Sequence, residues 1–312
     1  MRIAIVGAGG VGGYFGGLLA RQGHHVTFVA RGEHARAMRR EGLRLRRGGE
    51  DIHIPRVEVL SQPERAEPVD VVLFCVKAYD TESAALAWQG LLKPGTLWLT
   101  LQNGVDSFER LAGIMPAHHV VPGAAYVSAV IAAPGVIACT GSMSGFVFGE
   151  RAPSGGGRCA RFAAACAGAG FEATVSSDIG KELWTKFIAL ATNAALTGVT
   201  RQPAGVVYRL PELLALARVS AREIVAVAGA SGIGLDQNAE EQALRLLSGL
   251  PAGMYASLYH DLAGGRPIEN AVLSGFVSRA GARLGIPTPF HDFAHACLKP
   301  YEARACGREG GT

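Results

Sequence analysis

The stretch MRIAIVGAGGVGGYFGGLLARQGHHVTFVARG, residues 1–32, decides the fold. A short apolar run at residues 2–6 precedes seven glycines between Gly7 and Gly17. Residues 11–21 are typical of a helix with small residues on one side, and residues 25–30 of a second strand. A strand, a glycine-rich turn, a helix and a strand within about thirty residues predict a β-α-β unit.

Three of these glycines have the spacing Gly7-x-Gly9-x-x-Gly12, which is informative because it follows a strand and opens a helix. Gly7 permits the tight turn, Gly9 lets a pyrophosphate approach the backbone, and Gly12 lets the helix pack on the strand. The N–H groups at the start of the helix then face the anion. The alternative is a glycine-rich turn without a ligand. The predicted cofactor-binding residues here are Gly7, Ala8, Gly9, Gly10, Val11 and Gly12.

The second strand ends in Ala30-Arg31, where a dinucleotide-binding pattern usually has an acid for the ribose 2′-hydroxyl of NAD. An arginine at this place can pair with a 2′-phosphate and stack on adenine, so we expect NADP(H) as the cofactor. The alternative is an exposed arginine at a strand end. Basic residues cluster over residues 31–47, which indicates either a solvated surface or an anion site.

Strands and helices continue to alternate, which predicts an α/β, doubly wound, mostly parallel sheet with helices on both faces. A small hairpin is expected between residues 43 and 59, split by Gly48-Gly49, and a loop at residues 154–157 precedes an alanine-rich helix. The expected strands lie at 69–76, 96–102 and 119–132, and the helices between them at 81–92 and 105–115.

Strand patterns stop after about residue 178, and the rest of the chain predicts an all-α domain. We therefore expect an NADP-binding domain at 1–177, a helical substrate and catalytic domain at 178–303 and a flexible tail at 304–312. The expected helices are 178–200, with Asp178 as N-cap, then 211–232, 236–248, 252–263, 268–285 and 289–303.

The composition fits a globular protein of the cytoplasm: 312 residues, 49% hydrophobic, 18% charged and a net charge of +4. No apolar run reaches the length of about 20 residues that a membrane span needs, and the start lacks a signal-peptide pattern. We expect neither a membrane nor a nucleic-acid partner, because no aromatic stacking platform accompanies the basic residues. No metal site is expected, since His291 and His295 lack an H-E-x-x-H arrangement. Free thiols are expected at Cys75, Cys139, Cys159, Cys166, Cys297 and Cys306.

Beyond these local patterns, the chain contains five short motifs in a fixed order. They are IAIVGAGGVGGYFGGLLARQGHHVTFVARG (3–32), VKAYDT (76–81), LQNGV (101–105), ELWTKF (182–187) and SLYHDLAGGRPIENAVLSG (257–275). Through these motifs the chain resembles the ketopantoate reductase (2-dehydropantoate 2-reductase) family over residues 1 to about 303. The resemblance implies a Rossmann domain, a C-terminal domain like that of 6-phosphogluconate dehydrogenase, and NADPH-dependent reduction of 2-dehydropantoate to (R)-pantoate, a step towards pantothenate and coenzyme A.

The resemblance also implies roles for single residues. Lys186 matches the catalytic lysine and Glu269 the active-site glutamate. Ser257 matches the substrate-binding serine. Asn103 and Lys77 match residues of the first domain, and both are expected among the cofactor-binding residues. Asn103 would contact the nicotinamide ribose or the substrate, and Lys77 would also help to attract an anionic substrate.

Each of these residues also has a structural interpretation. Lys186 lies in an apolar helix, so it needs a partner or reaches water with its head group. Glu269 could pair with Arg266 at the surface. Ser257 could be a helix-surface residue, and Asn103 a turn residue.

Two helix positions depart from the family pattern, and so does Pro267-Ile268, which replaces the usual x-T before Glu269. The family commonly has asparagines four and eight residues after the lysine, where this chain has Leu190 and Ala194. Asn193 lies near the face of Lys186 but about 10 Å further along the helix, and we retain it as a substrate-binding candidate. The substrate is therefore either 2-dehydropantoate or another small 2-oxo acid or carbonyl compound; a non-catalytic NADP(H)-binding sensor is a third interpretation. A homodimer is a hypothesis by analogy alone.

Overall fold

The computed structural model describes residues 1–151 and 156–303. The expected tail at 304–312 and the first half of the expected loop at 154–157 lie outside the described residues. The chain consists of two compact units: an α/β unit, Met1–Gln102 with Asp106–Ile179, and a helical unit, Asn103–Val105 with the chain from Gly180 onward. Residues 103–105 thus belong to the helical unit, although in the chain they follow a strand of the α/β unit.

The first elements form the expected β-α-β unit: β1 (Arg2–Val6), α1 (Gly10–Arg21) and β2 (His25–Val29). β1 and β2 pair in parallel, with Ile3 opposite Val26. The helix begins at Gly10, one residue before the expected start, because Gly9 serves as its N-cap in an extended conformation.

Parallel strands extend this unit on both sides. β5 (Glu58–Leu60) pairs with β2, and β6 (Val71–Phe74), β7 (Leu97–Thr100) and β8 (Val120–Ala133) follow on the other side of β1. The order β8-β7-β6-β1-β2-β5 is that of a Rossmann sheet. The chain first adds β2 and β5 on one side of β1 and then adds β6, β7 and β8 on its other side. The expected doubly wound sheet is confirmed.

The sheet also has a mixed extension. β9 (Val136–Phe148) returns antiparallel to β8 after the turn at Pro134-Gly135, and β10 (Glu172–Val175) pairs with it in parallel. The hairpin of β3 (Leu43–Arg47) and β4 (Glu50–Ile54), split by Gly48-Gly49 as expected, joins β9 through β3. Neither β9 nor β10 was among the expected strands, because glycine and polar residues interrupt their apolar pattern.

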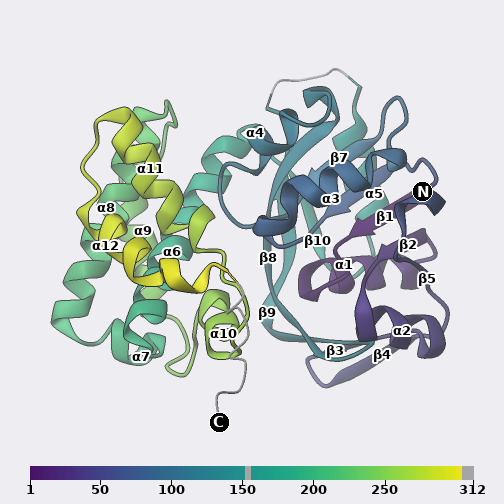
Figure 1. Ribbon diagram of the computed structural model, residues 1–312, viewed down its shortest axis with the longest axis horizontal. Coiled ribbons are helices and arrows are strands. Elements are labelled where there is room, and N and C mark those ends of the chain that lie inside the picture. Colours follow the sequence, from purple (N-terminus) through teal and green to yellow (C-terminus); the bar gives the residue numbers. More distant parts are fainter. Residues whose placement is uncertain (152–155, 304–312) are drawn as a thin grey trace, which may run out of the picture. The chain divides into compact units, whose positions relative to one another are not determined.

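Alternate residues of the central strands face two separate cores. Ile3 and Ile5 lie in the core that α1 and α5 (Arg158–Cys166) cover. Ala4 and Val6 lie in the core beneath α3 (Thr81–Ala87) and α4 (Ser107–Ala112). Side chains of a strand alternate between its faces, so a strand buried on both sides is apolar throughout, as the sequence is here. Figure 1 shows these helices around the sheet.

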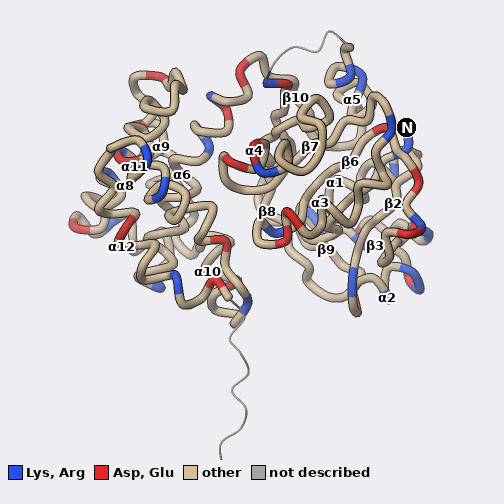
Figure 2. The backbone as a smooth tube through the Cα atoms, turned by 45° about the horizontal axis from the view of Figure 1, so that its top comes forward, with Lys and Arg blue, Asp and Glu red and all other residues tan. Residues whose placement is uncertain are grey.

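The basic stretch over residues 31–47 forms α2 (Gly32–Glu41) and β3, and most of its charges are paired. Arg36 pairs with Glu33, and Arg44 lies 3.4 Å from Asp51. Blue and red positions lie together around α2 and β3 in Figure 2. This stretch is therefore a surface of ion pairs.

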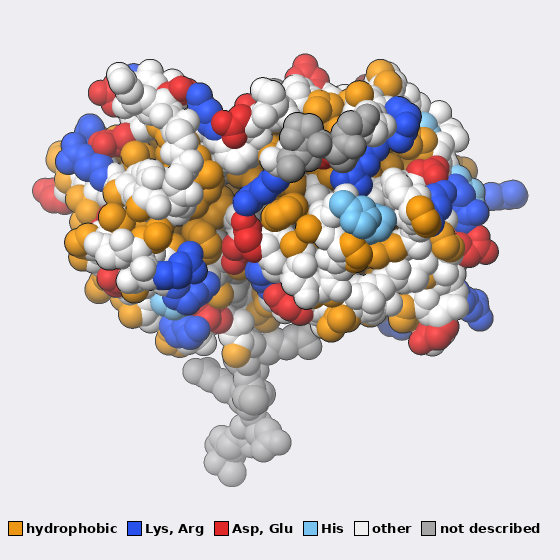
Figure 3. All heavy atoms as spheres, turned by 90° about the horizontal axis from the view of Figure 1, so that it is seen from above, with side chains coloured by type: hydrophobic (Ala, Val, Ile, Leu, Met, Phe, Trp, Pro, Cys, Tyr) orange, Lys and Arg blue, Asp and Glu red, His pale blue; other side chains and the backbone are white. Residues whose placement is uncertain are grey.

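Figure 3 draws a different face of the molecule, the one seen from above in Figure 1. On this face basic side chains lie among acidic and apolar ones.

The described part of the helical unit contains no strand (green to yellow in Figure 1). Its helices are α6 (Ile179–Thr200), α7 (Ala204–Val207), α8 (Pro211–Ala230), α9 (Ala239–Ser248), α10 (Ser257–Ala263), α11 (Ser274–Leu284) and α12 (Pro289–Leu298). Across residues 1–151 and 156–303, no helix combines the length and the apolar character that a membrane crossing requires.

Four of the helix boundaries expected here were wrong by three residues or more. The expected helix 252–263 begins only at Ser257, and the expected helix 268–285 begins only at Ser274. The expected helix 236–248 begins at Ala239, and the expected helix 289–303 ends at Leu298, before a 3-10 turn over Lys299–Tyr301. Pro267 precedes the segment expected from 268 onward, and a short 3-10 turn over Asn270–Val272 occupies its start. Asn270 is fully buried and its amide donates to His295 and Glu302, so distant contacts hold this segment out of the helix.

Candidate functional site

The glycines of the first turn have distinct surroundings. Gly7 has a φ of +96°, and a Cβ there would lie 2.7 Å from the backbone nitrogen of Val76. A Cβ at Gly12 would overlap the carbonyl oxygen of Gly7 and lie 2.8 Å from the side chain of Ile5. A Cβ at Gly9 would meet nothing within 4 Å. Two glycines are therefore needed for packing, whereas Gly9 borders open space at the start of a helix.

This open space has the chemistry of an anion site. α1 begins at Gly10, so the N–H groups of its first turn have no partner within the helix. The N–H of Ala8 is not available, because it donates to the carbonyl of Val29 at 3.0 Å. The residues present fit a dinucleotide pyrophosphate: a bare backbone, a helix N-terminus and no acidic side chain in the first turn.

Arg31 lies directly beyond β2 as expected, with its side chain 80% exposed. Its Nη2 donates to Oδ2 of Asp80 at 2.8 Å, forming an ion pair. Asp80 belongs to the turn after β6, so its position beside Arg31 depends on the strand order and was missed by sequence analysis.

The turn after β6 carries Lys77, which is half-buried. Its backbone carbonyl accepts from the N–H of Asp80 at 2.8 Å. Lys77 thus follows β6 at the carboxyl end of that strand, the edge at which open α/β sheets bind ligands.

Gln102 holds this turn from the next strand. Its side chain is 5% exposed, and the amide nitrogen donates to the carbonyl of Val76 at 3.1 Å and to the hydroxyl of Thr81 at 2.8 Å. The amide oxygen accepts from Thr100 at 3.1 Å. Gln102 belongs to the LQNGV motif, but sequence analysis assigned a role only to its neighbour Asn103. The sequence feature that could have identified Gln102 is a polar residue at the end of a buried apolar strand.

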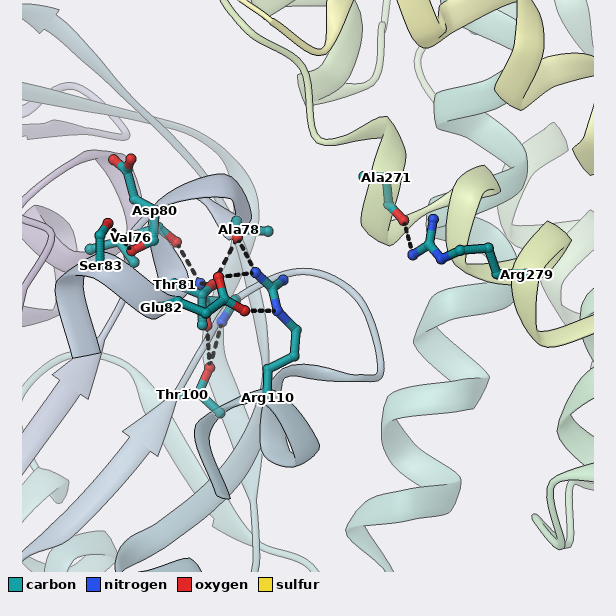
Figure 4. Close-up of polar contacts among 11 residues, drawn as sticks. Val76, Ala78, Asp80, Thr81, Glu82, Ser83, Thr100, Arg110, Ala271 and Arg279 are labelled. Atoms are coloured by element: carbon teal, nitrogen blue, oxygen red, sulfur yellow. Dashed lines mark hydrogen bonds and ion pairs between the residues drawn. The ribbon is translucent and has the colours of Figure 1, made fainter. Parts of the chain in front are cut away.

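Arg110 of α4 holds the same turn from outside. Its guanidinium contacts both carboxylate oxygens of Glu82, at 2.7 and 2.8 Å, and the carbonyl of Ala78 at 2.7 Å. Thr81 donates to that same carbonyl at 2.9 Å. Figure 4 shows Arg110 reaching across to these groups. The turn that carries Lys77 is thus fixed by side chains from two other elements.

Lys186 lies on α6 and is half-buried among apolar neighbours. Its Nζ donates to Oδ1 of Asn103 at 3.4 Å, a long hydrogen bond. Burial lowers the pKa of Lys186 to about 8, and the negative charge of Glu269 acts in the opposite direction. Three of the expected residues therefore interact in the structure: Lys186 donates to Asn103, and the charge of Glu269 acts on Lys186.

Glu269 precedes the 3-10 turn over Asn270–Val272 and is 8% exposed. The surface pair with Arg266 does not form, because Arg266 pairs with Asp261 at 2.9 Å instead. A buried carboxylate that acts on a half-buried ammonium is a pattern typical of functional sites.

The other two substrate-binding candidates differ in their environment. The amide oxygen of Asn193 accepts from the hydroxyl of Tyr208 at 3.0 Å, and its side chain is 7% exposed. Ser257 is exposed and is the first residue of α10. Of the two helix positions that depart from the family pattern, Leu190 is half-buried and Ala194 is fully buried.

His291 and His295 share α12, but each has its own set of neighbours. His291 is fully buried between Ser220 and Ser274, and His295 lies 2.9 Å from the amide of Asn270. Within residues 1–151 and 156–303, no three His, Cys, Asp or Glu side chains form a group that could hold a metal ion. The cysteines of these ranges are free thiols, while Cys306 lies outside them.

A family model described as "Ketopantoate reductase PanE/ApbA" matches residues 3–153, and "Ketopantoate reductase PanE/ApbA C terminal" matches residues 178–302. The chain belongs to the ketopantoate reductase family. The resemblance found in the motifs is confirmed, and with it membership in a family of oxidoreductases.

Individual relatives cover nearly the whole chain. The 2-dehydropantoate 2-reductase of Mycobacterium tuberculosis is 32% identical over 293 residues, 93% of this chain and 94% of that protein. A ketopantoate reductase family structure from Ralstonia eutropha JMP134 is 36% identical with a TM-score of 0.88, covering 97% of this chain and 98% of that one. A ternary structure of D-mandelate dehydrogenase with NADH and anilino(oxo)acetate shares the fold, with 23% identity, a TM-score of 0.90 and the same coverage.

Proposed function

We propose that this chain reduces the ketone of a small 2-oxo acid with NADPH, and that the substrate is 2-dehydropantoate, which gives (R)-pantoate for pantothenate and coenzyme A. The observation that carries the proposal is the half-buried ammonium of Lys186, which has a pKa near 8, donates to Asn103 and is affected by the negative charge of Glu269. The membership of the chain in the ketopantoate reductase family supports the same reaction, and so does the relative named 2-dehydropantoate 2-reductase.

The cofactor would be held by the α/β unit. The residues for its pyrophosphate are those from Gly7 to Gly12, supported by the open space at Gly9. Arg31 would pair with the 2′-phosphate, and Lys77 and Asn103 would contact the ribose or phosphate groups nearer the reacting end. When bound, NADPH supplies the hydride that reduces the carbonyl carbon.

The helical unit supplies the acid. A ketone oxygen gains negative charge as its carbon is reduced, and it must receive a proton. The ammonium of Lys186 stabilises this charge and donates the proton. Glu269 keeps the lysine protonated near neutral pH, because its charge opposes the effect of burial. Ser257 has an exposed hydroxyl that can donate to the substrate carboxylate.

This assignment gives the two parts of the chain separate tasks. We place cofactor binding in residues 1–177 and proton donation in residues 178–303. Asn103 would serve the proton donor directly, because its amide oxygen accepts from Nζ of Lys186.

The experiment that tests the proposal follows NADPH oxidation with 2-dehydropantoate as substrate. We expect turnover by the unsubstituted chain and a loss of about 10²–10⁴-fold in Lys186→Ala, the usual contribution of a general acid. NADPH binding, measured by its fluorescence, should persist in that variant. Lys181→Ala is the control, because Lys181 lies on the same helix and pairs with Asp236. Near-normal turnover in Lys186→Ala would reject the lysine as the acid.

A second candidate substrate class has its own support. Leu190 and Ala194 are apolar, and the amide oxygen of Asn193 is occupied by Tyr208. These residues favour a 2-oxo acid with an apolar side chain over one with a terminal hydroxyl. A turnover screen over 2-oxo acids distinguishes the two, and NADPH binding without reduction of any carbonyl compound would indicate a sensor instead.

A further inference from the structure

Arg31 has a carboxylate partner that the first strands of the chain do not supply. The acid expected at the end of β2 is absent from the sequence there, yet Asp80 places its Oδ2 2.8 Å from Nη2 of Arg31. Asp80 comes from the end of β6, with β1 lying between β6 and β2 in the sheet. It is the charged partner of Arg31 within the described ranges.

Hydrogen bonds fix the backbone of Asp80, so the fold determines where its carboxylate lies. Its N–H donates to the carbonyl of Lys77 at 2.8 Å, and its own carbonyl accepts from the hydroxyl of Ser83 at 3.1 Å. Its side chain is 32% exposed, compared with 80% for Arg31. Figure 4 shows Asp80 and Ser83 on this turn.

A carboxylate at this place affects the two nicotinamide cofactors in opposite ways. It occupies one side of the guanidinium and repels a 2′-phosphate, which carries about two negative charges. It also accepts a hydrogen bond from a ribose 2′-hydroxyl, the role that an acid at the end of the second strand has in NAD-binding domains. One side chain thus weakens binding of the phosphorylated cofactor and favours the other.

We propose that Asp80 is a cofactor-selectivity residue that reduces the preference of this chain for NADPH over NADH. The inference rests on the proposed function, because it assumes that the ribose of the adenosine lies beside Arg31. Arg31 and Asp80 would then form one site for the 2′ position of the ribose. Arg31 would bind the 2′-phosphate of NADPH, and Asp80 would bind the 2′-hydroxyl of NADH.

The test measures the dissociation constants of NADPH and NADH by fluorescence titration. Asp80→Asn keeps the shape and one acceptor oxygen but removes the charge. We expect the ratio of the NADH constant to the NADPH constant to rise about tenfold, and the rise to shrink at high salt. Glu67→Gln is the matched control, since it removes one carboxylate from an exposed ion pair with Arg2 at the amino end of β1. Its ratio should equal that of the unsubstituted chain.

The outcomes separate the inference from the proposed function. An unchanged or lower ratio in Asp80→Asn would overturn the inference, and a lower ratio would mean that Asp80 orients Arg31 towards the phosphate. If the unsubstituted chain binds neither cofactor, the proposed function and the inference are both wrong. Arg31→Ala should lower the ratio, whereas equal weakening of both cofactors would show that Arg31 does not recognise the phosphate.

Discussion

Lys186 carries a charge that changes close to neutral pH. Burial lowers its pKa from 10.5 to about 8, so the ammonium form predominates below pH 8 and is lost above it. Because the proposed reduction needs the ammonium to donate a proton, kcat/KM for ketone reduction should be level below this pKa and fall as pH rises through it. A pH profile of kcat/KM measures this directly, and a rate that rises above pH 8 would contradict the role.

Glu269 should move that pH dependence in a stated direction. Its negative charge raises the pKa of Lys186, so Glu269→Gln removes this effect and the fall in kcat/KM should begin at lower pH. Glu241→Gln is the control, since Glu241 is exposed, pairs with Arg245 at 3.5 Å on α9 and takes no part in the proposed reaction. A profile that keeps its midpoint in Glu269→Gln would mean that the two side chains do not interact.

Gln102 should contribute to stability through its buried hydrogen bonds. Gln102→Ala leaves the carbonyl of Val76 and the hydroxyl of Thr81 without this donor, and one unsatisfied buried group costs about 1–3 kcal/mol. We expect the free energy of unfolding, measured in urea, to fall by that amount. Gln89→Ala, which removes an exposed glutamine with a 3.3 Å bond to Ile114, should change it by less than about 0.5 kcal/mol.

Helix α1 permits a comparison between two glycines of one turn. A Cβ at Gly12 would overlap the carbonyl of Gly7 and crowd Ile5, whereas Gly9 has open space and a φ of −76° that any residue adopts. Gly12→Ala should therefore destabilise the α/β unit by about 1–3 kcal/mol or more. Gly9→Ala should fold normally, because nothing in the chain meets its methyl group.

Cofactor binding then distinguishes the two roles of glycine in α1. The methyl group in Gly9→Ala would stand where the proposed pyrophosphate approaches the backbone, so the NADPH dissociation constant should rise at least about tenfold. Thermal unfolding without cofactor and fluorescence titration with it measure both quantities. Normal NADPH affinity in a folded Gly9→Ala chain would place the cofactor elsewhere.

The stability of the helical unit should depend on pH, because His291 is fully buried between Ser220 of α8 and Ser274 of α11. Burial lowers the pKa of His291 from 6.5 to about 4, so the folded state holds the neutral imidazole. The unfolded chain binds a proton between these two values and the folded chain does not. Stability is therefore full above pH 6.5 and is lost as the pH falls towards 4.

The expected loss from this one group is on the order of 2 kcal/mol at about pH 5. Denaturant unfolding at neutral and mildly acidic pH should show it in the unsubstituted chain and in His118→Gln, whose side chain is exposed. His291→Gln should be less stable at neutral pH, because it removes contacts to Ser220 and Ser274, but should lose this part of the pH dependence. The same pH dependence in His291→Gln would contradict the assignment.

Local sequence patterns were enough for the β-α-β unit, the parallel sheet and the change to helices after residue 178. Strand periodicity, a glycine turn and helix periodicity each depend on a few neighbouring residues, so they can be read without knowledge of the fold. The family motifs identified Lys186 and Glu269 as candidates, because each motif is also short and contiguous. The cofactor and substrate roles given to single residues remain predictions.

The pairings between distant segments depended on the tertiary structure. Asp80 lies beside Arg31 because only β1 stands between β6 and β2, the strands that precede these two residues. Gln102 reaches Val76 because β7 lies beside β6. Glu269 lies outside a helix because Asn270 is bound by His295 from α12. Such contacts follow from which strands and helices become neighbours, and the packing of the whole core determines that order, so no local pattern in the sequence contains it.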